Sequence, residues 1–253
     1  MESVLFFDTE VDPKNGRILD YGGSFEEKIL HTGDTNEFLK FIQKGKFLCA
    51  HNILLHDIPA LQKFIPDVDF SKYTLIDTLH LSPLMFPQKP YHRLIKDDKL
   101  QTDQINNPLN DALATKDVFY DVLAAFDILP NSLKEIFASL LSRTSQFEGF
   151  FKLKNNNYKS SKLKEEILEF FGEKICHNKE LEELIDKSPV ELGYALAIIN
   201  VNGSKSVTPP WVLKQYPKTA FIVNLLCNNP CFEGCSFCDT HHDSNKALKE
   251  FFG

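Results

Sequence analysis

The sequence predicts an α/β protein: a mixed β-sheet flanked by helices, followed by a smaller helical region and a cysteine-rich segment. Three observations predict this architecture. Short apolar runs alternate with helical patterns over the first half of the chain, which is typical of a central sheet covered by helices. From residue 132 onward the apolar residues recur at helical spacing. Four of the six cysteines then fall between Cys227 and Cys238.

Composition indicates a folded protein of 253 residues, 43% hydrophobic and 25% charged, long enough for one large domain or two smaller ones. The sequence contains no run of about 18 apolar residues, so we expect no transmembrane helix. The N-terminus lacks the basic, apolar and small-residue regions of a signal peptide. The clustering of the cysteines favours metal binding over disulfides. It also favours a location in the reducing cytoplasm. The net charge of −7 argues against a general polyanion-binding surface, but a carboxylate site that binds cations carries negative charge itself.

The first element is a strand over residues 4–10, whose apolar run ends at Asp8 and Glu10. Strand side chains alternate between faces, so these two carboxylates point the same way and Thr9 points the other way. Two acids on one face need a cation, a proton or solvent. Oxygen-rich clusters of this kind suit Mg²⁺ or Mn²⁺. A solvated strand end is the alternative, and it is the more frequent one for this motif alone.

The next elements complete the sheet and its first helices. Turn signals at 12–16 precede the next strand, and Asp34 or Thr35 is expected to cap the first helix. A buried strand runs into His51 and Asn52, and Asp57 precedes a helix that begins at Pro59 and ends near Phe64. The strands are expected at residues 17–23, 27–30, 46–50 and 73–79, the last of them containing Asp77-Thr78.

A long helix is expected to begin at Asn107-Pro108, an N-cap residue followed by proline at the first helical position. Asp111 lies in its first turns, where the helix dipole favours a carboxylate. The apolar pattern breaks at residues 129–131. We therefore expect a first domain over 1–128, a helical domain over 129–206 and a cysteine-rich segment over 207–253.

The helical domain is expected to contain four helices, near 132–141, 163–171, 178–185 and 188–199. Ser188 and Glu191 form a capping box around a proline at the first helical position of the last of them. A further helical stretch is expected to end at Leu226. No residue pattern in this middle part indicates a chemistry.

The cysteine-rich segment contains Cys227, Cys231, Cys235 and Cys238, followed by His241 and His242. Four thiolates, or three thiolates and one histidine, fit a structural Zn²⁺ ion. An iron–sulfur cluster also takes four cysteines and is the less favoured alternative. Four unliganded cysteines so close together are the least favoured interpretation.

Four features now stand in order: Asp8-x-Glu10, His51-Asn52 followed by Asp57, Asp77-Thr78, and Asp111 on a helix. This order resembles the DEDD superfamily of 3′–5′ exonucleases over residues 1 to about 128. The resemblance implies an RNase H-like fold in which Asp8, Glu10, Asp57 and Asp111 are catalytic and hold two Mg²⁺ or Mn²⁺ ions. It implies a structural role for Asp77-Thr78. Two such ions hydrolyse a phosphodiester bond by activating water and stabilising the leaving oxygen.

One position departs from the family. The histidine that serves as general base five residues before the last aspartate is Asn106 here, and asparagine cannot accept a proton near neutral pH. His92 could reach the site from the preceding loop, although a surface histidine is the favoured interpretation. Lys96, Lys99 and Arg93 could contact phosphates, but a solvated loop explains such a run more often.

The segment from Thr208-Pro209-Pro210-Trp211 through the cysteines to residues 247–253 resembles the stretch before the motor in helicases of the RecQ type. The chain is therefore expected to be the N-terminal part of an exonuclease–helicase fusion, with no phosphate-binding loop of its own. The leading function is a 3′–5′ exonuclease that acts on DNA. The alternatives are RNA as substrate, or a nucleic-acid-binding module with little turnover.

Overall fold

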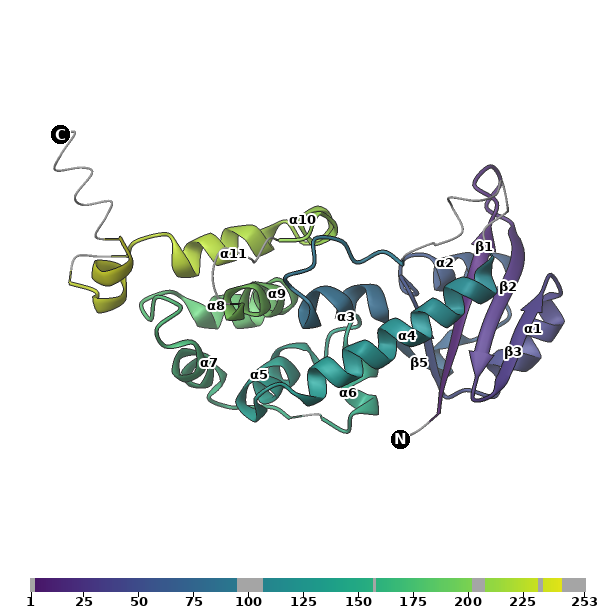
Figure 1. Cartoon of the computed structure of the whole chain (residues 1–253), viewed down its shortest axis with the longest axis horizontal. Coiled ribbons are helices and arrows are strands. Elements are labelled where there is room, and N and C mark those ends of the chain that lie inside the picture. Colours follow the sequence, from purple (N-terminus) through teal and green to yellow (C-terminus); the bar gives the residue numbers. More distant parts are fainter. Residues whose placement is uncertain (1–2, 95–106, 157, 202–207, 232–233, 243–253) are drawn as a thin grey trace. The chain divides into compact units, whose positions relative to one another are not determined.

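The computed structural model describes residues 3–94, 107–156, 158–201, 208–231 and 234–242 (Figure 1). The chain forms two compact units. Unit 1 comprises Met1–Met85, His92–Ile128 and Ser142–Asn157, and unit 2 comprises Phe86–Tyr91, Leu129–Leu141 and Tyr158–Gly253. Residues 142–157, which we expected in the helical domain, thus belong to the unit that contains the sheet.

Unit 1 contains a five-stranded mixed sheet in the order β3-β2-β1-β4-β5. β2 and β3 run antiparallel to their neighbours, whereas β4 and β5 run parallel to β1. The predicted α/β class with a mixed sheet is confirmed. The strands are β1 (Val4–Val11), β2 (Ile18–Phe25), β3 (Lys28–Thr32), β4 (Phe47–Ala50) and β5 (Thr74–Asp77).

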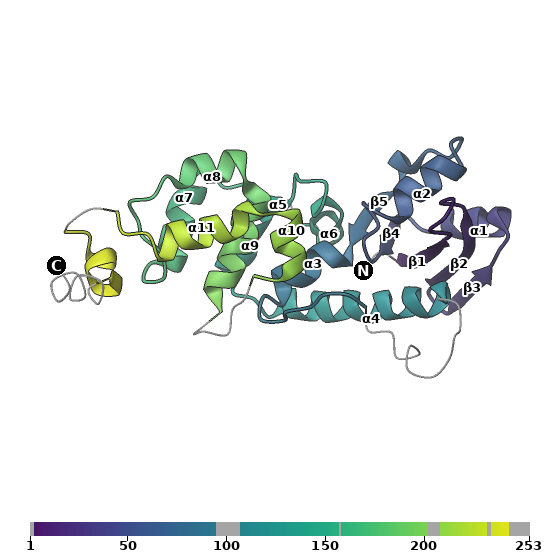
Figure 2. The same cartoon turned by 90° about the horizontal axis from the view of Figure 1, so that it is seen from above.

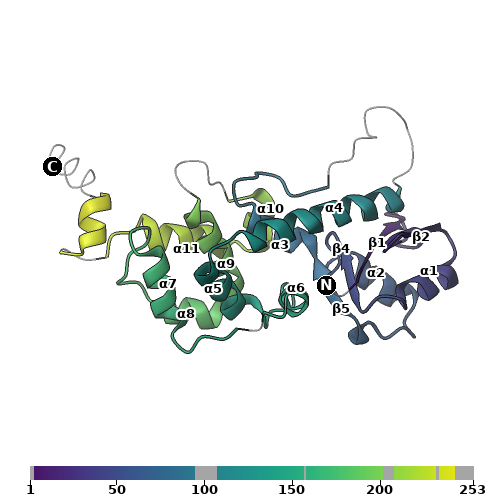
Figure 3. The same cartoon turned by 60° about the horizontal axis from the view of Figure 1, so that its bottom comes forward.

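Helices cover both faces of the sheet because β1 is apolar on both (Figure 3). On one face, Phe7 lies in a buried cluster with side chains of α1 (Thr35–Ile42) and α2 (Asp57–Phe64). On the other face, the ring of Phe6 packs edge-on against that of Phe119 in α4 (Pro108–Asp127), with centroids 5.3 Å apart. The alternation along one strand thus separates the two helical layers.

The predicted caps fix where two helices begin. Asp34 accepts a hydrogen bond from the backbone N–H of Asn36 at the start of α1. Asn107 Oδ1 accepts one from the backbone N–H of Leu109, at 3.0 Å, at the start of α4. Both caps satisfy N–H groups that have no partner within the helix.

Two helices of unit 1 were not predicted. The expected strand over 73–79 ends at Asp77, where α3 (Thr78–Met85) begins. This helix is buried on all sides, so its sequence lacks the polar face that marks an amphipathic helix. The other is α6 (Glu148–Leu153), which packs against β5. A Cβ atom at Gly149 would lie 1.8 Å from the carbonyl oxygen of Leu75, so only glycine permits this approach.

Unit 2 is helical and is built around α9 (Pro189–Asn200), which packs against α5, α8 and α11 (Figure 2). Eight of the twelve residues of α9 are buried, as expected for the central helix of a bundle. The other helices are α5 (Asn131–Leu141), α7 (Leu163–Phe171), α8 (Leu181–Lys187), α10 (Pro210–Gln215) and α11 (Lys218–Cys227). No helix in the described part of either unit is long and apolar enough to cross a membrane.

Candidate metal centres

The parallel strands β1, β4 and β5 of unit 1 end on the same side of the sheet. Asp8 and Glu10 lie near the end of β1, and Asp57 follows the end of β4. In the parallel pair of β1 and β4, Phe6 lies opposite Cys49, so Asp8 and His51 follow at the same level two residues further on. Ala50 in turn lies opposite Asp77 of β5. Ligands of open α/β sheets commonly bind beyond the carboxyl ends of the parallel strands.

The start of α4 lies on the face of the sheet that carries Asp8. Gly22 is directly opposite Asp8 in the antiparallel pair of β1 and β2, so a side chain at position 22 would point to the same face as Asp8. A Cβ atom built there would lie 2.1 Å from the backbone nitrogen of Leu109. Glycine therefore permits the first turn of α4 to rest directly on the sheet beside Asp8.

Asp111 lies at the same end of this face as the two acids of β1. Phe119 packs on Phe6, and Asp111 is eight residues earlier, about 12 Å along the helix axis. Glu10 is four residues beyond Phe6, about 13 Å along the strand. Asp8, Glu10 and Asp111 are all partly exposed, and we call these three acids the carboxylate rim.

Asp57 approaches β1 from another side. Its Oδ1 accepts hydrogen bonds from the hydroxyl of Thr9 at 2.8 Å and from the backbone N–H of Thr9 at 3.1 Å. The side chain of Thr9 lies on the opposite face of the strand from Asp8 and Glu10. Asp57 is completely buried, and its Oδ2 makes no hydrogen bond within the described part of the chain.

The environment of Asp57 disfavours its charged form. Burial raises its pKa to about 6, and the charge of Asp77 adds to this, while His56 and the two hydrogen bonds from Thr9 lower it. A buried carboxylate oxygen without a donor is costly unless a cation or a proton satisfies it. Asp57 is therefore suited to bind a cation through its second carboxylate oxygen.

The four carboxylates do not form one tight set of ligands. Over the described residues, the only set of three or more His, Cys, Asp or Glu side chains whose ligand atoms all lie within 4.8 Å of one another is a group of four cysteines. The structure thus brings Asp8, Glu10 and Asp111 to one face of the sheet and holds Asp57, at the start of α2, against Thr9 on the other face, without closing a single-ion site.

Asp77 has a structural role, as the resemblance to the DEDD family implied. Its carboxylate accepts hydrogen bonds from the backbone N–H groups of Asn52, Leu54 and Leu79, at 2.9 to 3.2 Å. These bonds hold the turn after β4, in which Asn52 has a φ of 77°. They also begin α3, because Leu79 lies in its first turn. Asp77 therefore shapes the segment that leads to Asp57.

Two histidines lie beside this turn. His51 Nδ1 lies 2.9 Å from the hydroxyl of Thr78, and burial lowers its pKa to about 4, although Asp77, the backbone of His92 and Asp111 raise it. His92 itself is only 6% exposed, and its Nδ1 lies 2.7 Å from the hydroxyl of Ser82. Our interpretation of His92 as a surface residue was therefore wrong. Asn106, Lys96 and Lys99 lie outside the described residues.

The cysteine cluster is in unit 2, and its membership differs from our expectation. The four thiols that gather are those of Cys176, Cys231, Cys235 and Cys238, and they could hold a metal ion such as zinc. Cys176 Sγ lies 3.5 Å from that of Cys231, 3.9 Å from that of Cys235 and 3.7 Å from that of Cys238.

Cys227 is not part of this cluster, so its predicted role as a ligand was wrong. Its thiol donates a hydrogen bond to the carbonyl oxygen of Lys174, at 3.3 Å. Cys176 was missed because it is remote in sequence and stands alone there. Neither His241 nor His242 is in this cluster. His241 Nδ1 instead lies 2.9 Å from the carbonyl oxygen of Phe237, and its ring stacks on the Phe237 ring.

The thiol of Cys235 has a lower pKa than the thiols of Cys176 and Cys238. The backbone N–H of Cys238 is the main cause that lowers the pKa of Cys235 to about 6, with help from neighbouring thiols and Asn178. Burial instead raises the pKa of Cys176 to about 12. The surroundings of Cys235 therefore favour its thiolate, whereas burial favours the protonated thiols of Cys176 and Cys238. A bound cation favours the thiolate form of a ligand cysteine.

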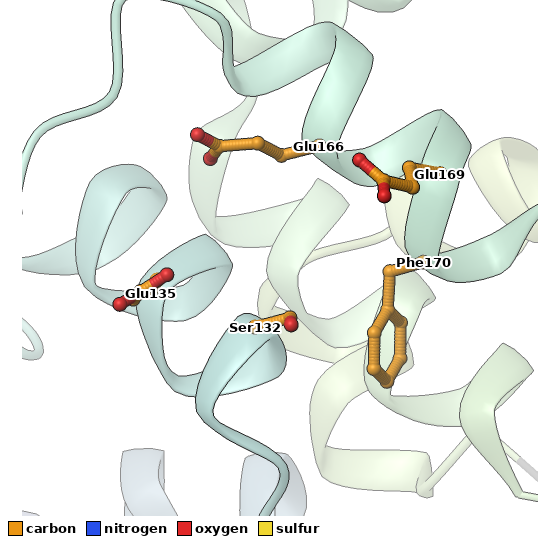
Figure 4. A pocket seen from close by; sticks show the side chains of 5 residues that line it. All are labelled: Ser132, Glu135, Glu166, Glu169 and Phe170. Atoms are coloured by element: carbon orange, nitrogen blue, oxygen red, sulfur yellow. The ribbon is translucent and has the colours of Figure 1, made fainter.

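Unit 2 also contains a hollow between α5 and α7 (Figure 4). Three glutamates give it a negative lining, and Glu166 is held in place there by the hydroxyl of Ser160, at 2.6 Å. None of the predicted site residues lines this hollow. Its lining residues are Ser132, Glu135, Glu166, Glu169 and Phe170.

Among the described residues, the thiol cluster of unit 2 is the one group whose ligand atoms lie close enough together to hold a metal ion. The carboxylate rim of unit 1 carries acids but forms no such group. The rim offers hard oxygen ligands, and the cluster offers soft sulfur ligands. Protein-family models, curated proteins and solved structures were all compared with the chain, and none of them matches it.

Proposed function

We propose that unit 1 is a metal-dependent nuclease domain that hydrolyses phosphodiester bonds, with Asp8, Glu10, Asp57 and Asp111 as the ligands of two divalent ions. The observation that carries the proposal is the buried carboxylate of Asp57, one oxygen of which makes no hydrogen bond within the described residues. This carboxylate lies against Thr9, the residue between Asp8 and Glu10 in β1, and a buried oxygen without a donor suits a cation.

When bound, a pair of Mg²⁺ or Mn²⁺ ions about 3.5–4 Å apart activates a water molecule and stabilises the leaving oxygen. A pair of this size needs ligands on several sides. Asp8, Glu10 and Asp111 offer oxygens from one face of the sheet, and Asp57 offers its second oxygen from beside Thr9. Four acids spread in this way suit two ions better than one.

The strand order supports an RNase H-like sheet, in which three antiparallel strands precede two parallel ones. The 3′–5′ direction and DNA as substrate follow from the resemblance to the DEDD exonucleases. A helicase motor later in the same polypeptide, as the second resemblance implies, would expose the strand that unit 1 trims.

The test is a nuclease assay on single-stranded DNA labelled at its 5′ end, with Mn²⁺ or with EDTA. We expect a ladder of shortened products with Mn²⁺ and none with EDTA. Asp111→Asn should reduce the rate to the EDTA background. Asp117→Asn is the matched control, because Asp117 is an exposed acid on the same helix. Equal rates for wild type and Asp111→Asn would contradict the proposal.

A second candidate function is nucleic-acid binding with little turnover, and the asparagine at position 106 favours it. Under this alternative the domain retains DNA in the presence of Mn²⁺ without shortening it. The same assay on labelled RNA distinguishes the two substrates, because the sequence contains nothing that selects the sugar. If the protein binds DNA but produces no shortened strand with Mg²⁺ or with Mn²⁺, the binding module is favoured.

We propose that the thiol cluster of unit 2 holds one structural Zn²⁺ ion. A tetrahedral ion with Zn–S bonds of about 2.3 Å places its sulfurs about 3.8 Å apart. The sulfurs of Cys231 and Cys238 lie 3.6 Å apart, and those of the other three cysteines lie 3.5 to 3.9 Å from that of Cys176. Thiolates on different irons of an iron–sulfur cluster lie further apart than thiolates on one ion, so this spacing favours a single ion.

A further inference from the structure

The thiol cluster joins two segments that are far apart in the sequence. Cys176 lies in the connection between α7 and α8, and it is separated by 55 positions from Cys231. The other three cysteines follow α11, and Cys235 and Cys238 flank the start of a short helical segment that runs from residue 236 to 242. An ion bound by all four would therefore cross-link the α7–α8 connection to the end of the described chain.

The α7–α8 connection is already fixed to α11 by bonds that involve no metal. The backbone N–H of Cys176 donates to the carbonyl oxygen of Leu226 at 2.9 Å. The thiol of Cys227 donates to the carbonyl oxygen of Lys174 at 3.3 Å. Cys176 is thus held in position by α11 without a metal ion. Among the described residues, the segment with the other three thiols makes no backbone-to-backbone hydrogen bond to this connection.

Asn178 adds a second layer to the cluster. Its side-chain amide lies 3.2 Å from the sulfur of Cys235 and 3.7 Å from that of Cys231. Thiolates accept hydrogen bonds from such amides, and partners of this kind orient ligands and tune the affinity for the metal. Cys176 and Asn178 come from the same short connection, so this connection supplies both a ligand and an outer-layer donor.

We infer that the ion is a cross-link, which we call the clasp, between the α7–α8 connection and the segment that carries Cys231, Cys235 and Cys238. Cys176 binds the ion from the connection. Asn178, from the same connection, donates hydrogen bonds to the thiolates of Cys231 and Cys235. Cys227 has a different role, because its half-buried thiol donates a hydrogen bond to the carbonyl oxygen of Lys174 in the connection. The inference rests on the proposed zinc ion, and it specifies which residues hold the ion and what the ion joins.

The experiment compares Cys176→Ser with Cys227→Ser in the full chain purified without chelator. Wild type and Cys227→Ser should each contain about one equivalent of zinc by elemental analysis, and Cys176→Ser should contain much less. Asn178→Ala should keep the ion but release it to a chromogenic chelator at about 10- to 100-fold lower chelator concentration. Limited proteolysis should cut residues 228–242 faster in Cys176→Ser than in Cys227→Ser.

The outcomes distinguish the proposed zinc ion from the proposed cross-link that it forms. Wild-type protein without zinc, or with iron in its place, overturns the proposed zinc ion itself. Zinc in the wild type that is lost from Cys227→Ser and kept in Cys176→Ser overturns the clasp and leaves the zinc ion intact. If Cys176→Ser does not fold, Asn178→Ala still tests the clasp, because unchanged zinc release from that variant contradicts the role of the connection.

Discussion

Asp57 Oδ1 lies 2.8 Å from the hydroxyl of Thr9 and 3.1 Å from its backbone nitrogen, so one residue of β1 satisfies one oxygen of a completely buried carboxylate. The other oxygen makes no hydrogen bond within the described residues. Thr9 stands between Asp8 and Glu10 in the same strand. The pair thus joins the start of α2 to the strand that carries the other two acids.

We predict that Asp57→Asn stabilises the metal-free protein above pH 6. Burial raises the pKa of Asp57 from 3.8 to about 6, so the folded protein binds this proton more tightly than the unfolded chain. Stability therefore falls as the pH rises from 4 to 6 and stays low above it. The shift corresponds to up to about 3 kcal/mol, which asparagine avoids because it cannot ionise.

The measurement is urea unfolding in EDTA at pH 4 and pH 8. Asp57→Asn should raise the free energy of unfolding at pH 8 and leave it unchanged at pH 4. Asp67→Asn, which changes an exposed acid, should leave it unchanged at both pH values. Adding Mn²⁺ at pH 8 should stabilise the wild type and not Asp57→Asn, because the ion needs the carboxylate. A gain that is equal at both pH values would show that ionisation of Asp57 is not its cause.

Gly22→Ala should displace the start of α4 and lower the free energy of unfolding by about 1–3 kcal/mol or more. A Cβ atom at position 22 would lie 2.1 Å from the backbone nitrogen of Leu109, and backbone atoms cannot yield as a flexible side chain can. Gly33→Ala is the control, since its Cβ atom would meet only the carbonyl oxygen of Leu19, at 3.6 Å. Equal urea midpoints for the two variants would contradict this role of Gly22.

Much of unit 1 could be predicted from the sequence because its signals are local. Alternation along β1 separated Phe6 and Asp8 from Phe7 and Thr9, and Asn107 marked the first turn of α4 by a capping preference. The missed helix α3 shows the limit of such signals. It is buried on all sides, so its apolar run carries no periodicity that separates a helix from a strand.

The site was harder to predict because it depends on contacts between distant segments. Cys176 has no neighbouring cysteine in the sequence, and only the fold brings it to Cys231, 55 positions away. His92 sits in a polar run that is typical of exposed loops, yet its ring is buried against Ser82. Asp57 followed from motif order, whereas its bonds to Thr9 could be seen only in three dimensions.

Removal of the metal from the thiol cluster should loosen unit 2 locally and leave the sheet of unit 1 unchanged. Metal binding at such sites is coupled to local folding, and each unit has its own buried core. Hydrogen exchange after treatment with a strong chelator should accelerate in residues 234–242 and in the α7–α8 connection. Amides of β1 and β4 should keep their protection, and equal acceleration in β1 would contradict this prediction.

The last prediction concerns how water is activated without the histidine of the DEDD family. Asn106 cannot accept a proton near neutral pH. His51 is close enough to Asp111 to be affected by its charge, but burial lowers the pKa of His51 to about 4 and its Nδ1 lies against Thr78. A base with so low a pKa takes up little of the proton from an attacking water at neutral pH. The task therefore falls mainly on the proposed metal ions.

We thus expect slow turnover that is faster with Mn²⁺ than with Mg²⁺, because Mg²⁺ demands a nearly ideal octahedral site. Asn106→His should raise the rate, within the roughly 10²–10⁴-fold that a positioned general base contributes, and Asp8→Ala should abolish it in both metals. The measurement is the single-turnover rate on labelled single-stranded DNA across pH 6 to 9. In Asn106→His the rate should rise with pH through the pKa of the new imidazole, near 6.5. A variant that matches the wild type at every pH would show that position 106 does not face the attacking water, whereas an equal background rate in wild type and Asp8→Ala would favour the binding module.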